Sequence, residues 1–308
     1  MKRTINPGTE KRTLFCHDDI CFSHTTDLRG EPLELRMSIQ TVMNRPENRR
    51  GEDPDETSVR GVLPVLVWIN GGGWRGGHRN IQAPEMAYFA QRGYASVCID
   101  YRSSGQAKFP AQIEDVKTAV RFLKAHAEQY HLDAGRIAVM GRSAGGYLAA
   151  MAAMNDEDFV TGEWSEQSSR VHAAVDMFGP VDLVMLHDIN RELAAKPGYR
   201  WSDVMETHEG ALLGGDPATL RERCQAASPA YRIRETMCPL LILHGDKDPL
   251  VPFAVSQDFY ERLQAAGLGD RVELVTVKNA GHGTREFFQT STKKWILRFL
   301  NRALKVDS

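Results

Sequence analysis

One stretch near the middle of the chain constrains the fold more than any other. It opens with a short apolar run at 136–140, which is typical of a buried strand. A turn of small residues, Gly141-Arg-Ser-Ala-Gly145, comes next, and residues 147–154 are rich in Ala, Leu and Met, as a helix would be. The two glycines let the backbone bend sharply without Cβ clashes. The pattern therefore predicts Ser143 at the apex of the turn, with its hydroxyl raised off the sheet.

The G-x-S-x-G spacing by itself is a weak signal, because about one chain in ten of this length contains it by chance. The flanking strand and helix strengthen it. The free N–H groups at the start of that helix would point towards Ser143, which favours a nucleophile over an ordinary turn residue. The rest of the chain has to supply the partners that a nucleophilic serine needs.

Apolar runs and helix-like segments alternate along most of the chain. We predict strands at 62–69, 94–101, 136–140, 171–178, 239–244 and 271–277, and helices at 83–92, 111–130, 147–154, 253–266 and 285–304. This alternation predicts an α/β fold with a mostly parallel central sheet and helices on both faces. The length of 308 residues allows one large α/β domain or two smaller ones, and we predict a single domain, 1–308, because the irregular stretch 182–237 is short and lacks long apolar runs of its own.

Two parts of the chain depart from this alternation. Residues 1–34 are mixed and polar, with one candidate strand at 19–23; a strand is predicted at 35–43, and 44–61 has the composition of a charged loop. Residues 182–237 are polar and rich in His and Glu. Because long irregular connections tend to be functional, we interpret 182–237 as a small cap or lid inserted over the carboxyl end of the sheet.

The charge balance excludes some classes of partner. Lys and Arg number 38 against 40 for Asp and Glu, and there is no basic block, so neither nucleic acid nor an anionic membrane is an expected partner. No apolar run reaches about 18 residues, the length that a membrane span needs. No apolar segment follows the basic residues at the N-terminus, so we expect a cytoplasmic protein, with a removed export signal as the alternative.

The cysteines favour free thiols over disulfides. Their number is odd, and no C-x-x-C or Cys/His spacing suggests zinc. We therefore expect no bound metal, a reducing compartment and free thiols at Cys16, Cys21, Cys98, Cys224 and Cys238.

A serine nucleophile needs a base, and the base needs an acid to orient it. Two later strands end in suitable residues, and the carboxyl ends of α/β strands gather at one edge of the sheet. We predict Asp248, in His244-Gly-Asp-Lys-Asp248, as the acid and His282, between two glycines, as the base. The order Ser143, Asp248, His282 is that of the elbow fold.

The same two strand ends have structural interpretations. Asp246 and Asp248 could both be turn-forming residues ahead of Pro249, although we expect only Asp246 to hold the turn. His244 lies at the end of a predicted strand, where a packed, hydrogen-bonded structural residue is expected. His282 has no apolar neighbours in the sequence, which disfavours a buried structural role.

A glycine run follows the predicted strand at 62–69. Asn70-Gly-Gly-Gly exposes backbone N–H groups without obstructing side chains, so we predict the Gly72, Gly73 and Ala144 N–H groups as donors to an oxyanion. The alternative is a flexible turn, but the tryptophans at 68 and 74 indicate a packed loop. Neither G-x-G-x-x-G nor a Walker lysine is present, so no nucleotide or other cofactor is expected.

Taken together, these motifs resemble the α/β-hydrolase esterase/lipase family, in the branch of hormone-sensitive-lipase-like and feruloyl or acetyl-xylan esterases. The resemblance spans about residues 62–300 and implies a triad of Ser143, Asp248 and His282. It also implies structural roles for Tyr101-Arg102 and Asp115, which we expect to include an Arg102–Asp115 ion pair. The motifs that carry the resemblance are Asn70-Gly-Gly-Gly-Trp74, Asp100-Tyr-Arg102, Phe109-Pro-Ala-Gln-Ile-Glu-Asp115, Gly141-Arg-Ser-Ala-Gly-Gly146, His244-Gly-Asp-Lys-Asp248 and Gly281-His-Gly283.

Two residues distinguish this chain within that pattern. Asn70 stands where the family usually has His; Asn can hold the loop by hydrogen bonds, so we expect activity to survive. Arg142 is large for its place in the elbow, and we expect it to bias the pocket towards polar or acidic substrates.

The resemblance implies a cofactor-free serine carboxylic ester hydrolase that acts on short-acyl or aromatic-acyl esters. Acetyl and feruloyl esters are favoured, carbohydrate-linked esters among them. One alternative is an amide or peptide hydrolase, similar to a formamidase or a peptidase, although no propeller-like extra domain is present. The other is a non-catalytic binding relative, which would not need a complete triad.

Overall fold

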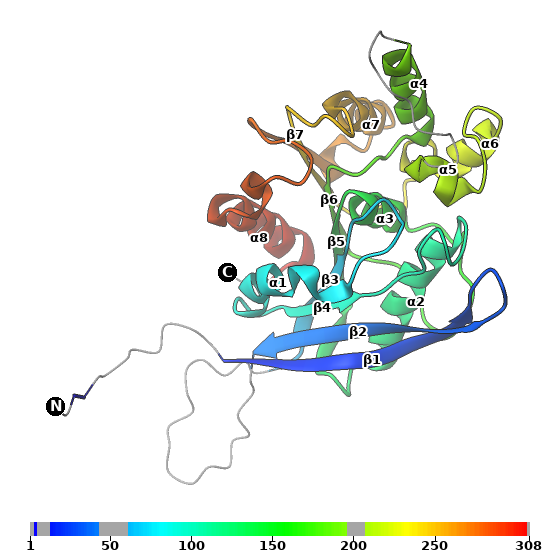
Figure 1. Ribbon diagram of the computed structural model, residues 1–308. Coiled ribbons are helices and arrows are strands. Elements are labelled where there is room, and N and C mark those ends of the chain that lie inside the picture. The colour runs from blue at the N-terminus through cyan, green and yellow to red at the C-terminus, as the bar shows by residue number, and fades with distance from the viewer. Residues whose placement is uncertain (1–2, 5–12, 43–60, 196–206, 307–308) are drawn as a thin grey trace.

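An eight-stranded sheet runs through the centre of the protein in the order β1-β2-β4-β3-β5-β6-β7-β8 (Figure 1). The computed structural model describes residues 3–4, 13–42, 61–195 and 207–306. The β1–β2 and β2–β4 pairs are antiparallel, and all pairs from β4 to β8 are parallel, which confirms the predicted mostly parallel α/β sheet. The strands are β1 (Leu14–Thr26), β2 (Pro32–Val42), β3 (Leu63–Ile69), β4 (Ala95–Ile99), β5 (Leu132–Arg142), β6 (Ala173–Met177), β7 (Leu240–Gly245) and β8 (Val272–Val277).

Helices cover both faces of this sheet. One face packs against α1 (Ala83–Ala90) and α8 (Thr290–Leu304), and the other against α2 (Ala111–Ala125), α3 (Ala144–Ala153) and α7 (Phe253–Ala265). Strand β7 accordingly sends alternate side chains into two separate cores. Because neither face of these strands contacts solvent, their side chains on both faces are apolar, and the strands appear in the sequence as continuous apolar runs. Short 3₁₀ helices η1 (Arg79–Gln82), η4 (Gly269–Arg271) and η5 (Arg285–Phe288) join these elements.

Two predicted helices were too long. The helix predicted over 111–130 ends at Ala125, and His126 leaves the helical conformation at φ −108°. The helix predicted over 285–304 is divided into η5 and α8, because Gln289 between them is extended (φ −68°, ψ 154°). In both places the helical spacing of polar and apolar residues extends past the end of the α-helix, so periodicity alone overestimates the length of the helix.

The N-terminal region was the main omission of the sequence prediction. Apart from the strand predicted at 35–43, which is β2, it was left almost unassigned, yet β1 and β2 form a long antiparallel ribbon at one edge of the sheet (Figure 1). Strand β1 is mostly exposed, and its register with β2 shifts between His17 and Ile20 and between Cys21 and Ser23. These bulges break the alternation that would have identified a strand. The predicted charged loop at 44–61 lies, except for Gly61, outside the described residues.

A buried arginine connects this ribbon to the rest of the sheet. Arg79 donates hydrogen bonds to Asp18 (3.3 Å), Asp19 (2.9 Å) and Asp100 (3.1 Å). Asp18 and Asp19 belong to β1, and Asp100 follows β4, so this guanidinium joins β1 to the end of β4. The hydrogen bonds compensate much of the cost of burying its charge.

The predicted ion pair between Arg102 and Asp115 is confirmed. The guanidinium lies 2.7 Å from one carboxylate oxygen, and the Arg102 backbone N–H donates to the other at 2.8 Å. Burial raises the pKa of Asp115 to about 6, although the hydrogen bonds from Arg102 lower it. The pair connects the end of β4 to helix α2.

The described parts of the segment 182–237, namely 182–195 and 207–237, lie beside the carboxyl end of the parallel strands (Figure 1). Its described elements are α4 (Leu183–Ala194), α5 (His208–Leu213), α6 (Arg221–Ala226) and η3 (Pro229–Tyr231). It packs into the same core as α2 and α3 through side chains such as Leu183, Leu212 and Leu213. In the described part of the chain, no helix combines the length and apolar character needed to cross a membrane.

Candidate active site

Ser143 occupies a strained turn between β5 and α3. Its backbone has φ 51° and ψ −123°, a conformation that costs a non-glycine residue energy and persists only where its surroundings enforce it. The glycines on either side provide the necessary space: a Cβ on Gly145 would overlap the carbonyl of Ile69, and a Cβ on Gly141 would overlap the backbone of Gly145. The sharp strand–turn–helix unit predicted for this stretch is confirmed.

The fold brings Ser143, His282 and Asp248 into one chain of hydrogen bonds. Ser143 Oγ lies 2.8 Å from His282 Nε2, and His282 Nδ1 lies 2.7 Å from Asp248 Oδ2. A carboxylate can only accept, so the Nδ1–H donates to Asp248 and Nε2 is left to accept from the serine hydroxyl. The ring of His282 also packs edge-on against Phe178, with the ring centres 4.8 Å apart. The three residues predicted from separate strand ends therefore meet with the geometry of a nucleophile, base and acid.

Asp248, rather than Asp246, is the aspartate that reaches His282. Oδ1 of Asp248 accepts hydrogen bonds from the N–H groups of Leu250 (2.9 Å) and Val251 (3.0 Å). Burial raises the pKa of Asp248, but hydrogen bonds from His244, His282 and the Val251 N–H outweigh it and hold this pKa well below its usual value. Asp248 therefore stays ionised at neutral pH.

Asp246 connects two loops of the site, which extends the turn role predicted for it. Its Oδ1 accepts the Asn279 N–H at 2.6 Å, so the loop after β7 is held to the loop after β8 that carries His282. The two aspartates, two positions apart, thus have different partners.

His244 is buried and fully hydrogen-bonded, which confirms its prediction as a packed structural residue. Its Nε2–H donates to the Val251 carbonyl (2.8 Å), and its Nδ1 accepts from the Ser256 hydroxyl (2.7 Å). The same Nε2 also lies 3.3 Å from Asp248 Oδ2. Sequence reasoning missed this contact with the acid; the spacing of four residues between His244 and Asp248 was the available signal.

The glycine run after β3 lies beside Ser143. Gly72 and Gly73 have φ 128° and φ 58°, which favour glycine, and a Cβ on Gly71 would come within 3.2 Å of Ser143 Cβ. Trp74 is buried and packs edge-on against Tyr147 of α3, with ring centres 5.1 Å apart, so the loop is packed as predicted. Gly72, Gly73 and Ala144 all line the same cavity as Ser143.

Asn70 is buried beneath this loop. Its backbone carbonyl accepts the Tyr101 hydroxyl at 3.0 Å, and its side chain packs so closely on Gly77 that a Cβ there would overlap it. Among the described residues, Asn70 Oδ1 has no hydrogen-bond partner. The hydrogen bond by which Asn70 holds the loop is therefore made by its main chain and not by its side-chain oxygen.

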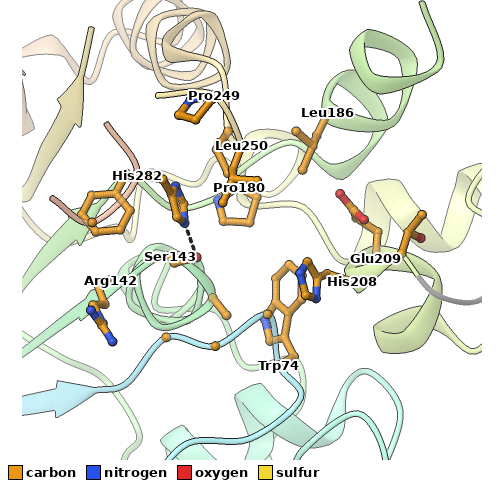
Figure 2. Close-up of a pocket in the computed structure, with 18 of the residues that line it drawn as sticks. Trp74, Arg142, Ser143, Pro180, Leu186, His208, Glu209, Pro249, Leu250 and His282 are labelled. Atoms are coloured by element: carbon orange, nitrogen blue, oxygen red, sulfur yellow. Dashed lines mark hydrogen bonds between the residues drawn. The ribbon is translucent and has the colours of Figure 1, made fainter. Parts of the chain in front are cut away.

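A cavity of about 670 Å³ opens above Ser143 (Figure 2). Apolar side chains such as Phe178, Pro180 and Leu250 form one part of its lining, and the polar Asn190, Thr207, His208 and Glu209 come from the 182–237 segment. Arg142 also lines the cavity, but Figure 2 shows its guanidinium directed away from the Ser143 hydroxyl.

One group of side chains in the described part of the chain could contact a metal ion, and it is not at this cavity. A bulge in β1 brings Cys21 Sγ and His24 Nε2 within 3.7 Å of each other, beside Glu34 of β2. Glu34 already forms a close ion pair with Arg36, and the group is largely exposed. All five cysteines are free thiols, as predicted.

A buried carboxyl group supports the turn behind His282. Asp176 of β6 is fully buried; its Oδ1 accepts the Gly179 N–H at 2.8 Å, and its Oδ2 has no partner among the described residues. Burial raises the pKa of Asp176 to about 7. The Phe178-Gly179 turn that it braces carries the ring that packs on His282.

Comparison with known proteins identifies the family of this chain. The BD-FAE family profile matches residues 54–263, more than half of the chain. The chain belongs to the BD-FAE family of α/β-hydrolase esterases. Among curated relatives, Esterase LipC of Mycobacterium tuberculosis is 30% identical over 88% of this chain and 68% of its own. The probable carboxylic ester hydrolase LipM of the same organism is 33% identical over 68% of this chain and 47% of its own. This chain therefore spans about half to two thirds of the length of these relatives.

A solved structure of the same fold covers nearly the whole chain. The thermophilic esterase Est2 of Thermogutta terrifontis is 25% identical, with a TM-score of 0.66 over 96% of this chain and 94% of its own. The same esterase has also been solved with butyrate bound.

The packing of the elbow leads to a first prediction. Gly145→Ala should lower the free energy of unfolding by at least about 2 kcal/mol, because the new Cβ would overlap the Ile69 carbonyl. Gly105→Ala is the matched control, since only Ser103 Oγ, at 3.7 Å, lies near its hypothetical Cβ. Urea unfolding of both variants checks this, and equal midpoints would contradict it.

The buried Asp176 predicts a pH dependence of stability. Its pKa is raised from 3.8 to about 7, so the folded protein retains a proton that the unfolded chain releases, and stability falls as pH rises between these values. Asp176→Asn removes this ionisation while keeping an acceptor for the Gly179 N–H. The Tm of the variant minus that of the wild type should therefore rise by several degrees between about pH 5 and about pH 8. A Tm difference that does not change with pH would contradict the assignment.

Proposed function

We propose that the protein is a cofactor-free serine carboxylic ester hydrolase. The observation that carries the proposal is the unbroken hydrogen-bond chain from Ser143 through His282 to an ionised Asp248, at the floor of a cavity beside a glycine-rich loop. The relatives named above as esterases support the same chemistry. The printed names of those relatives favour ester over amide hydrolysis, and an assembled triad disfavours a purely binding role.

Each residue has a defined part in the proposed reaction. Ser143 Oγ attacks the acyl carbon while His282 Nε2 takes the hydroxyl proton, and Asp248 stabilises the imidazolium that forms. The N–H groups of Gly72, Gly73 and Ala144 stabilise the oxyanion. His282 then passes the proton to the departing alcohol oxygen, which leaves an acyl-enzyme.

Water completes the cycle by the same steps in reverse. His282 takes a proton from the water that attacks the acyl carbon, and returns it to Ser143 Oγ as the carboxylic acid is released. No metal or cofactor enters either half of the reaction.

The cavity is large enough for a small ester substrate. Its volume of about 670 Å³ lies within the usual range for small-molecule sites. We propose short-acyl or aromatic-acyl esters as substrates, acetyl and feruloyl esters among them, including carbohydrate-linked ones. The butyrate bound to Est2 fits the short-acyl class.

The 182–237 segment, which contributes Leu186 and His208 to the lining, is the proposed cap, and we propose that it belongs to a single domain with the rest of the chain. The free thiols fit a cytoplasmic location.

Substitution of the nucleophile and the base tests the proposal. Ser143→Ala and His282→Ala should each lower kcat on a short-chain aryl ester by roughly 10⁴–10⁶. Ser291→Ala, an exposed serine on α8, should leave kcat unchanged. Thermal melts of all three variants check that folding is preserved.

Three results would exclude the proposal. Near-normal turnover by a purified Ser143→Ala or His282→Ala variant would show that these residues do not carry the chemistry. A fluorophosphonate probe that fails to label Ser143 in the wild-type protein would favour a binding relative. Faster cleavage of an amide than of its matched ester would instead move the protein to the amide hydrolases.

A further inference from the structure

A buried carboxylate on the cap faces the cavity without a partner. Glu209 is only 8% exposed and lines the cavity together with Ser143. Figure 2 shows its carboxylate directed into the cavity, on the same side as Leu186 and His208. Among the residues that the structure describes, none donates a hydrogen bond to the Glu209 carboxylate. When a substrate fills the cavity and displaces its water, a carboxylate in this position is costly unless the substrate pairs with it.

The described basic side chains that line the cavity form no hydrogen bond or ion pair with Glu209. Burial lowers the pKa of the His208 imidazole, so this ring is neutral at neutral pH. Arg142, the cation that lines the cavity, lies on the other side of Ser143 and is directed away from Glu209 (Figure 2). The carboxylate is therefore available to a group that enters the cavity.

The helix that carries Glu209 is held firmly in place. Leu212 and Leu213 of α5 are fully buried, and the carbonyl of Leu212 accepts the Phe109 N–H at 2.9 Å. The Lys108 ammonium donates to the Ala211 carbonyl at 2.9 Å. At the other end, the Thr207 hydroxyl accepts the Gly210 N–H at 3.0 Å. Glu209 is thus presented from a fixed element, as a specificity residue requires.

We propose that Glu209 forms a binding subsite for a hydrogen-bond donor on the ester substrate, a hydroxyl or a protonated amine. The proposal rests on the proposed esterase function and names the chemistry that the cavity selects. A substrate that carries the donor pairs the buried carboxylate, whereas an apolar analogue leaves it unpaired. The discrimination therefore arises from the unpaired group as much as from the bond formed.

Matched esters test this subsite. In each case kcat/KM for an ester that carries a donor is divided by kcat/KM for propyl butyrate. Glyceryl monobutyrate tests a hydroxyl on the alcohol side, propyl β-hydroxybutyrate tests a hydroxyl on the acyl side, and dimethylaminoethyl butyrate tests a cationic donor. Glu209→Gln should lower at least one of these ratios by roughly tenfold, because a charge-assisted hydrogen bond is lost. Propyl butyrate itself should be hydrolysed at least as fast as by the wild-type protein, because the charge that this apolar ester leaves unpaired has been removed.

Controls separate the subsite from folding and from the reaction itself. Glu222→Gln, an exposed glutamate on α6, should change no ratio. Because Glu209 forms no hydrogen bond within the described protein, Glu209→Gln should leave Tm unchanged or raise it. A fall in Tm of several degrees would show that Glu209 is held by the protein, and would overturn the proposal.

The kinetic outcomes also distinguish the two proposals. If Glu209→Gln hydrolyses propyl butyrate normally and every ratio equals that of the wild type, the subsite is refuted while the esterase proposal stands. If the wild-type protein cleaves none of these esters and Ser143 resists the fluorophosphonate probe, the esterase proposal itself fails. A fall in kcat/KM that is confined to the glyceryl, the hydroxyacyl or the amino ester identifies the donor and the side of the substrate that carries it.

Discussion

The close approach of two backbones at the elbow is the constraint on which the site depends. Gly145, in the first turn of α3, lies against the carbonyl of Ile69 at the end of β3, with no space for a side chain. This contact holds α3 directly over the sheet and leaves Ser143 in a conformation that an unconstrained chain would avoid. Because the glycine run begins one residue after Asn70, the same contact also places that run beside Ser143.

A second constraint is the need to satisfy a buried charge. Asp248 can stay ionised because both its oxygens accept hydrogen bonds, from two backbone N–H groups and from two histidines. The hydrogen bonds that lower its pKa also fix its orientation, so the direction of the His282 ring follows from them. Asp176, with a single donor, shows the opposite result, since its pKa rises to about 7. Asp176 on β6 and Asp248 in the loop after β7 thus differ in pKa because they differ in the number of their hydrogen-bond donors.

The floor and the polar lining of the cavity come from different parts of the chain. The floor comes from the ends of parallel strands, where the fold gathers functional groups. The polar lining comes from the 182–237 segment, whose leucines extend the same core that packs α2 and α3. Burial of these leucines is what allows a charged residue such as Glu209 to be held facing the cavity. The residues that would contact the rest of a substrate therefore lie on a different part of the chain from Ser143.

The sequence by itself determined the parallel sheet, the elbow and the candidate residues Ser143, Asp248 and His282. These follow from local patterns, since apolar runs, glycine spacing and strand-end polar residues depend on neighbours in the chain. Only the tertiary structure decided that β1 pairs with β2, that His244 contacts Asp248 and that Glu209 faces the cavity unpaired. Each of these depends on contacts between distant segments, and an exposed, bulged strand or a single glutamate in a polar stretch leaves no periodic signal. The reason is physical: local sequence sets which backbone conformations are available, whereas burial and pairing of polar groups are settled only when the segments pack together.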